Sequence, residues 1–215
     1  MKIALLVILA FFLSACQTLP VITQATSPEK NVSVCPNPFL KQKTTLIHAI
    51  EVHMSSGIKS AVIGITEADP ATRAISCAIM TAEGMVLFEA IETDGFLDIR
   101  RAMPPFDSAH FARNMIEDIK LIFFEPRGKI EQIGFLPSGE TACRWRTGNS
   151  DTVDVLKTSS GLPEVKRYSG SGKVKRYIKF SGLTGGFYQS IELQAQELAS
   201  YTLFMNLVEA RPAEN

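Results

Sequence analysis

The residue types that most often perform catalysis or bind metals are sparse in this sequence and form no familiar pattern. His48 and His53 lie in a stretch with strand-like alternation and odd spacing, so their side chains point to opposite faces and cannot share a metal ion there. The sequence contains no H-E-x-x-H, G-x-S-x-G or phosphate-loop motif and no C-x-x-C pair. We therefore predict no catalytic residue, no metal site and no cofactor; a hydrolase without a recognisable signature is the weaker alternative.

Cysteine is the other reactive residue type, and its four copies differ in their surroundings. Cys16 directly follows an apolar N-terminal run, whereas Cys35, Cys77 and Cys143 lie farther along the chain. In an oxidising compartment, the last three are consistent with one disulfide and one buried thiol. The sequence leaves all three single pairings open.

The first residues have the features of a secretory signal. Lys2 supplies a positive charge, an apolar run from Ile3 to Leu13 follows, and Leu13-Ser14-Ala15-Cys16 ends the run with small residues. This order is typical of a signal peptide, and the apolar run is too short to span a bilayer. We predict a signal peptide over residues 1–15; a plain signal peptide followed by a coincidental cysteine is the alternative.

The Leu-Ser-Ala-Cys ending resembles the lipobox of bacterial lipoproteins. The resemblance implies that Cys16 is the lipid-attachment site, with a diacylglycerol on its thiol and an acyl chain such as palmitate on its amine. Two or more acyl chains anchor a protein stably to a membrane, where one would bind reversibly. Gln17 stands where lipoproteins retained at the inner membrane tend to have Asp. The resemblance therefore implies an outer-membrane protein that faces the periplasm, with an inner-membrane or extracellular location as the alternative.

The composition indicates a globular body without a strong electrostatic preference. Lys and Arg together number 22, as do Asp and Glu, so we expect no binding to nucleic acid. Residues 16–43 are rich in Thr, Ser, Pro and Asn and show no periodicity, which is typical of a tether between a lipid anchor and a domain. We predict one domain over residues 44–210.

Short strand-like runs separated by turn residues fill most of this domain. They extend from 44 to 103 and resume from 130 to 208, with turns at Glu83-Gly84 and Asp94-Gly95 that are typical of hairpins. Between them, Asp107 or Ser108 can cap a helix that ends before Pro126. The fold class predicted is mainly β (α+β): an antiparallel curved sheet or half-barrel of about eleven strands, with one main helix as a lid.

Two further features concern the surfaces of the predicted sheet. Several strands, such as Met85-Val86-Leu87-Phe88, carry apolar residues on both faces, which favours a curved sheet with an apolar concave face. Basic residues gather around one hairpin, where they indicate either a patch for anionic lipid headgroups or, more simply, protection of a sheet edge. They are Lys166, Arg167, Lys173, Lys175, Arg176 and Lys179.

A lipobox, a polar tether, meandering strands, one mid-chain helix and further strands form the layout of the LolA/LolB-like lipoprotein family, which this chain resembles. It also resembles uncharacterised proteobacterial lipoproteins, some encoded beside aryl-polyene pigment genes. The resemblance implies an open half-barrel whose apolar concave face takes acyl chains. On this sequence the implied lining residues are Ile50, Val52, Ile63, Ile65, Ile75, Ile79, Leu87, Ile91, Ile178 and Phe180 on strands and Phe111, Met115 and Ile119 on the helix.

The predicted function follows from the anchor and the cavity together. The protein would bind a lipid or lipoprotein-like cargo, handed over by a LolA-like carrier, and assist its delivery to the outer membrane without a covalent step. LolB carries a protruding leucine at a hairpin tip, whereas the corresponding Thr81–Met85 tip here has an acid and Met85, so another lipid-like cargo is equally consistent. The alternative is a non-catalytic scaffolding lipoprotein of an envelope complex.

Overall fold

Twelve antiparallel strands form a single curved open sheet in the order β5-β4-β3-β2-β1-β12-β11-β10-β9-β8-β7-β6. This computed structural model describes residues 19–24, 35–104, 106–148, 150–197 and 200–213. The predicted fold class is confirmed, with twelve strands in place of about eleven. The predicted signal peptide, Cys16 and Gln17 lie outside the described residues.

The strands follow one another as hairpins, so nearly every neighbour in the sheet is also a neighbour in the chain. The single non-sequential pairing joins β1 to β12 and brings the two halves into one sheet. The first half comprises β1 (Thr44–Met54), β2 (Lys59–Ala68), β3 (Ile75–Met80), β4 (Val86–Thr93) and β5 (Phe96–Ala102). The second comprises β6 (Lys129–Phe135), β7 (Thr141–Arg146), β8 (Thr152–Lys157), β9 (Pro163–Tyr168), β10 (Val174–Thr184), β11 (Phe187–Ala195) and β12 (Tyr201–Pro212).

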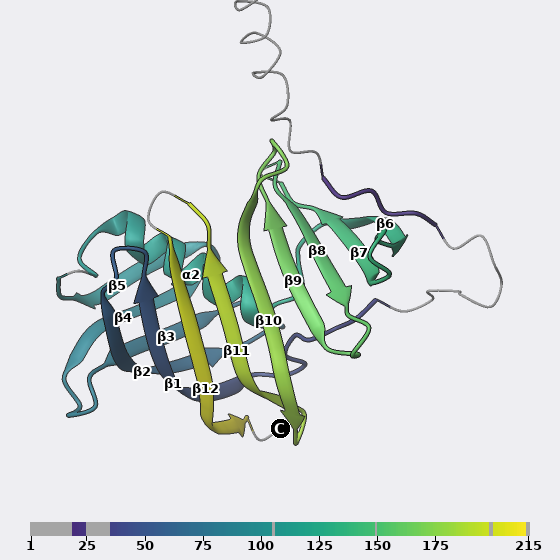
Figure 1. Ribbon diagram of the computed structural model, residues 1–215. Coiled ribbons are helices and arrows are strands. Elements are labelled where there is room, and N and C mark those ends of the chain that lie inside the picture. The colour runs from purple at the N-terminus through teal and green to yellow at the C-terminus, as the bar shows by residue number, and fades with distance from the viewer. Residues whose placement is uncertain (1–18, 25–34, 105, 149, 198–199, 214–215) are drawn as a thin grey trace, which may run out of the picture.

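The helix α2 (Ala109–Phe123) connects these halves and lies against one face of the sheet, behind the strands in Figure 1. Its start is capped because the Ser108 hydroxyl accepts a hydrogen bond from the amide of Phe111 at 3.1 Å. Its apolar side is buried, and Pro126 follows its end, as the sequence predicts. We call the sheet face that α2 covers the inner face and the opposite face the outer face.

The strand register determines which residues reach the inner face. Leu46, His48 and Ile50 of β1 point inward, and the residues opposite them share that face. His48 pairs with Gly64, and a Cβ on Gly64 would lie 2.6 Å from Cδ1 of Ile50. A larger residue at this position on β2 would therefore require the Ile50 side chain to move.

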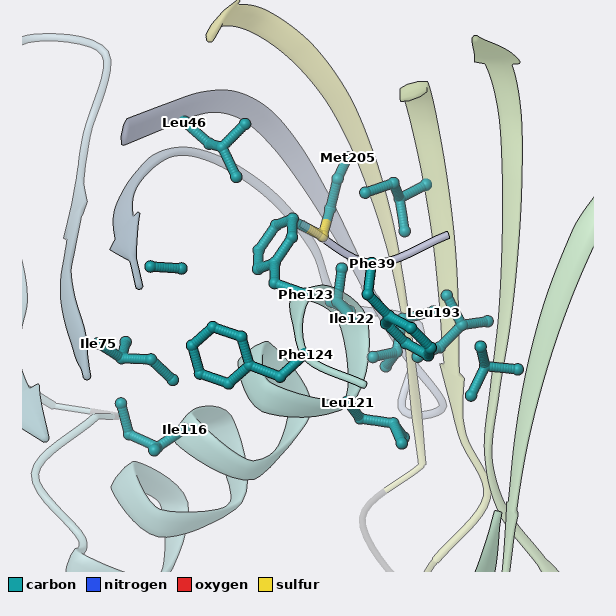
Figure 2. Close-up of a cluster of buried hydrophobic side chains, with 14 of the residues drawn as sticks. Phe39, Leu46, Ile75, Ile116, Leu121, Ile122, Phe123, Phe124, Leu193 and Met205 are labelled. Atoms are coloured by element: carbon teal, nitrogen blue, oxygen red, sulfur yellow. The ribbon is translucent and has the colours of Figure 1, made fainter. Parts of the chain in front are cut away.

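Most of the core lies between the inner face and α2. Figure 2 shows Phe123, Phe124, Ile122 and Ile116 of the helix pointing among strand residues of the core. Phe39, which precedes β1, enters the same cluster and is 5% exposed. The concave side of the sheet is therefore largely filled by the helix and by the segment before the first strand, rather than left hollow.

Parts of the predicted tether pack against the sheet. Thr23 forms an antiparallel bridge with Phe135 on the free edge of β6, with both backbone N–H to O distances at 2.9 Å. Ile22 is buried beside Leu136 in a small second cluster on the outer face. The N-terminal segment thus covers an edge that would otherwise expose unpaired backbone groups.

One of the three open cysteine pairings is present. Cys35 and Cys143 form a disulfide across 108 residues, with their Cα atoms 5.8 Å apart. Cys77 is a buried free thiol, and burial raises its pKa to about 12. Within the described residues, no helix is both long and apolar enough to cross a membrane.

Candidate functional site

An apolar pocket of about 280 Å³ lies on the inner face, between the segment before β1, the end of α2 and the β10–β11 hairpin. More of its lining surface is apolar than polar. The apolar side chains that form its walls are Phe39, Leu40, Leu46, Ile122, Phe123, Phe180, Phe187, Tyr188 and Ile191. Such a concave, mostly apolar space is the usual form of a binding site for an apolar ligand.

The first wall of this pocket is the segment that precedes β1. Its backbone is fixed to the helix because the Leu40 amide donates a hydrogen bond to the Phe123 carbonyl at 3.0 Å. The Phe39 amide donates to Oδ1 of Asn37 at 3.2 Å, and the disulfide at Cys35 holds the segment to β7. The wall therefore depends on a cross-link and on two hydrogen bonds rather than on a strand or helix of its own.

The second wall is the β10–β11 hairpin. Its turn is built from Gly185 and Gly186, whose φ angles of 59° and 86° favour glycine. The rings of Phe180 and Tyr188 lie 5.1 Å apart in a tilted arrangement on its two strands. Leu183 of the same hairpin is 61% exposed and is not one of the described residues that line the pocket.

The histidine on the pocket floor is uncharged at neutral pH. His48 is 2% exposed, and its ring lies 6.0 Å from that of Phe123. Burial lowers the pKa of His48 to about 4. The pocket therefore stays free of histidine charge above that pH, which suits an apolar occupant.

A buried ion pair joins α2 to the sheet near this core. Nε of Arg176 on β10 lies 2.6 Å from Oδ1 of Asp118, and the Tyr201 hydroxyl donates a hydrogen bond to the other carboxylate oxygen. Nη1 of Arg176 also pairs with Glu197 at 2.7 Å. Burial is the largest single influence and would lower the pKa of Arg176, but Asp118, Tyr201 and Glu197 together outweigh it and raise that pKa, so the guanidinium stays charged. The network fixes the helix over β10 and β12.

The predicted lining residues fall into three groups. Phe180 lines the apolar pocket, and Ile75 and Ile178 point inward but are buried in the core at 1% and 0% exposure. A second group is partly buried toward the helix side of the sheet: Ile50, Val52, Ile79, Phe111, Met115 and Ile119. Leu87 is also partly buried, as the extra residue where the β3–β4 register shifts.

The third group lies on the wrong face. Ile63 and Ile65 pair with Ala49 and Ile47 of β1, and Ile91 pairs with Ser76, all on the outer face. These isoleucines therefore cannot line an inner-face cavity. The prediction is wrong for these residues because β2 carries apolar residues on both faces. Its largest apolar residues, the isoleucines, point outward, and smaller residues occupy the inward positions.

The sequence-based interpretation missed the residues that form the pocket walls. Phe39 and Leu40 lie in the segment assigned to a tether, and Phe187 follows a glycine-rich turn. The sequence does hold a signal for these wall residues, because Phe39-Leu40 is an apolar pair within a polar, proline-rich stretch, and such a pair tends to be buried. Trp145, which is 3% exposed, joins the core on the inner face beside Cys143.

Neither interpretation of the basic hairpin holds. β9 and β10 are hydrogen-bonded on both sides, so their charges do not protect a sheet edge. The side chains also divide between the faces: Arg176 points inward to Asp118, whereas Lys166 and Lys179 lie over the Tyr177 ring at 4.7 and 5.1 Å. Charge pairing and cation–π contacts therefore account for five of the six basic residues, and Lys173 is exposed.

The described residues include no group of three or more His, Cys, Asp or Glu side chains that could hold a metal ion. No family model and no curated protein sequence matches this chain. Solved structures do resemble it. A LolA superfamily protein from Nitrosomonas europaea matches with a TM-score of 0.55 and 10% sequence identity, over 82% of this chain and 89% of that one. A putative outer membrane lipoprotein-sorting protein domain from Vibrio parahaemolyticus matches with a TM-score of 0.45 and 7% identity, over 80% and 85%.

The first of these likenesses shows that this chain has a LolA-like fold. The curved antiparallel sheet with a helix on its inner face is the shared architecture. The predicted resemblance to LolA/LolB-like proteins is thereby confirmed at the level of the fold.

Proposed function

We propose that this protein is a lipid-anchored envelope protein that holds an acyl chain of a lipid or acylated cargo in the apolar pocket and assists its delivery to the outer membrane. The observation that carries the proposal is the apolar pocket of about 280 Å³ on the inner face of a LolA-like sheet. Ligand pockets commonly span about 300–1,000 Å³. This pocket is near the lower end, so it encloses one acyl chain in part rather than a whole lipid.

The mechanism is exchange between two apolar environments, with no covalent step and therefore no enzymatic activity. Each buried methylene contributes about 0.8 kcal/mol, so a few methylenes in the pocket offset a corresponding part of the cost of leaving a membrane. Neutral His48 and the aromatic walls favour an uncharged chain over a polar ligand. The bound chain is then released when it enters the acyl region of the acceptor bilayer.

The anchor and the location rest on the sequence. The Leu-Ser-Ala-Cys ending supports lipid attachment at Cys16 after removal of residues 1–15, and Gln17 supports an outer-membrane position facing the periplasm. A LolA-like carrier would hand over the cargo there. Labelling cells with an alkyne analogue of palmitate tests the anchor: the wild-type protein should carry the label and fractionate with the outer membrane, and Cys16→Ser should do neither.

The binding role is tested by transfer of a fluorescent N-acylated peptide between two vesicle populations in the presence of the full chain. Phe187→Glu places a charge in the pocket wall, so it should slow transfer at least about tenfold. Leu183→Glu is the matched control because it adds the same charge to the same hairpin outside the pocket lining. Equal rates for both variants would contradict the proposal.

A scaffolding role is the second candidate, and the edge strand β5 favours it. Phe96 is 76% exposed, and Ile99 and Met103 on or next to this strand are also exposed. Exposed apolar residues on an edge strand offer a surface to which another chain can pair. Native mass spectrometry of the purified full chain separates the candidates: co-purified lipid supports carriage, and a lipid-free chain bound to a protein partner supports scaffolding.

A further inference from the structure

A second pocket, of about 340 Å³, differs from the apolar one in its charge. It lies where the β4–β5 turn, the last turns of α2 and the β7–β8 turn meet. Charged side chains dominate its walls, although Leu121, Phe124 and Val153 contribute apolar surface. It therefore offers groups for a polar ligand beside an apolar floor.

Glu92 on β4 is the unusual member of this lining. Its side chain is 7% exposed, and Oε1 lies 3.0 Å from Nζ of Lys120. Its other carboxylate oxygen, Oε2, is buried and has no hydrogen-bond partner among the described residues. A buried oxygen of this kind costs free energy unless a donor reaches it. The pocket lining thus includes a carboxylate with one buried oxygen that the described residues leave unpartnered.

Two arginines provide the opposite charge in the same pocket. Arg73 donates to the Glu125 carbonyl at 2.8 Å and lies over the Phe124 ring, while Arg127 forms no ion pair with any residue in the described ranges. Burial lowers the pKa of Arg73, and the nearby positive charge of Arg127 lowers it further. Arg73 and Arg127 thus lie close enough for their charges to interact, and together they offer a site for an anion, phosphate above all, while Glu92 and Glu117 also act on Arg73.

The charged pocket and the apolar one both adjoin an open depression of about 800 Å³. This depression shares Arg73 and Phe124 with the charged pocket. It shares Phe39 and Leu40 with the apolar pocket. The three spaces therefore follow one another along the inner side of the sheet, with apolar walls at one end and charged walls at the other. This order matches an amphiphile with its acyl chain at the first end and its headgroup at the second.

We infer that the charged pocket binds a zwitterionic headgroup of the phosphoethanolamine type, which specifies the lipid class of the proposed cargo and rests on the proposed function. The ammonium group donates to Oε2 of Glu92, and the phosphate lies between Arg73 and Arg127. A simple anion would fill only the arginine half and would leave the glutamate oxygen unpartnered. The unpartnered oxygen is what favours an amine-bearing ligand over a free phosphate.

The test titrates the full chain with two water-soluble probes, O-phosphoethanolamine and inorganic phosphate, and follows binding by NMR. Glu92→Gln keeps the shape and the contact with Lys120 but replaces the acceptor with a donor. It should weaken binding of phosphoethanolamine at least about tenfold and leave binding of phosphate unchanged. Arg127→Ala should weaken both probes. Glu89→Gln is the matched control, since Glu89 lies on the same strand outside the pocket lining and its Oε1 lies 3.9 Å from Nη1 of Arg100 on the adjacent strand.

Thermal unfolding gives an independent readout of the same variant. Without probe, Glu92→Gln should unfold near the wild-type temperature, because it weakens the contact with Lys120 but also removes a buried charged oxygen that lacks a partner. If the wild type binds both probes equally and Glu92→Gln changes neither affinity, the pocket is a site for free phosphate and the inference is overturned. Absence of saturable binding of phosphoethanolamine would also overturn it.

The outcome is separable from that of the proposed function. The soluble probes do not enter the apolar pocket, and the acylated-peptide transfer assay does not require an amine. If Phe187→Glu slows transfer while phosphoethanolamine fails to bind, the headgroup inference alone is wrong. If phosphoethanolamine binds and transfer is absent, the charged pocket is a headgroup site and the proposed carrier role is wrong.

Discussion

Removal of the disulfide between Cys35 and Cys143 should destabilise this protein strongly. The bond closes a loop across 108 residues, and chain entropy predicts about 4.7 kcal/mol of stabilisation for a loop of about 100 residues. Losses of about 2–5 kcal/mol are typical when a native disulfide is removed. We therefore expect the Cys35→Ala/Cys143→Ala double variant to lose about 3–5 kcal/mol of unfolding free energy.

The assay is urea unfolding of the full chain, compared between the wild type and the double variant with and without reductant. Reductant should lower the stability of the wild type to that of the double variant and leave the double variant unchanged. Cys77→Ala is the control: it removes a buried thiol but no cross-link and should cost only about 1 kcal/mol. The same double variant should also slow acyl transfer, since Phe39 and Leu40 lose their attachment to β7.

A loss below about 1 kcal/mol in the double variant would refute the reasoning. It would mean that the hydrogen bond from Leu40 to Phe123 and the burial of Phe39 hold the segment without the cross-link.

Three further predictions follow from buried groups and close contacts. The free energy of unfolding should fall by up to about 3 kcal/mol as the pH drops from about 6.5 to about 4. In this range His48 is protonated in the unfolded state but stays neutral in the folded state, where its pKa is lowered. His48→Leu should remove this part of the pH dependence in urea unfolding, and an unchanged slope would contradict the assignment. Arg176→Met should lower the free energy of unfolding by about 3–5 kcal/mol, because it leaves Asp118 buried without its partner. Adding Asp118→Leu should restore most of this loss, and additive losses in the double variant would contradict the pairing. Gly134→Ala should speed amide hydrogen exchange in residues 19–24, because the new Cβ would lie 2.1 Å from a backbone oxygen of that segment. Gly148→Ala is the control, since the space around Gly148 is open, and it should leave exchange unchanged. Equal exchange rates in the two variants would contradict the contact at Gly134.

Figure 1 also shows why the site depends on long-range contacts. The segment before β1 crosses from the first half of the sheet toward β7, and the β10–β11 hairpin reaches the same region from the second half. Each wall of the apolar pocket comes from a different part of the chain. Sequence patterns, which report on neighbours within one strand or helix, do not reveal such a meeting.

The sequence by itself determined the local elements of this protein. Period-two alternation and glycine turns such as Asp94-Gly95 specify antiparallel hairpins, and Ser108 with Pro126 sets both ends of the helix, because these effects act within a few residues. Only the tertiary structure decided which face of each strand points inward. Ile63 and Ile65 look equivalent to inward residues in the sequence, but the pairing of β2 with β1 turns them outward and places Gly64 beneath Ile50 on the inner face. It also decided that Cys35 pairs with Cys143 and that Phe39 is core, because both depend on the closing of a loop across much of the chain.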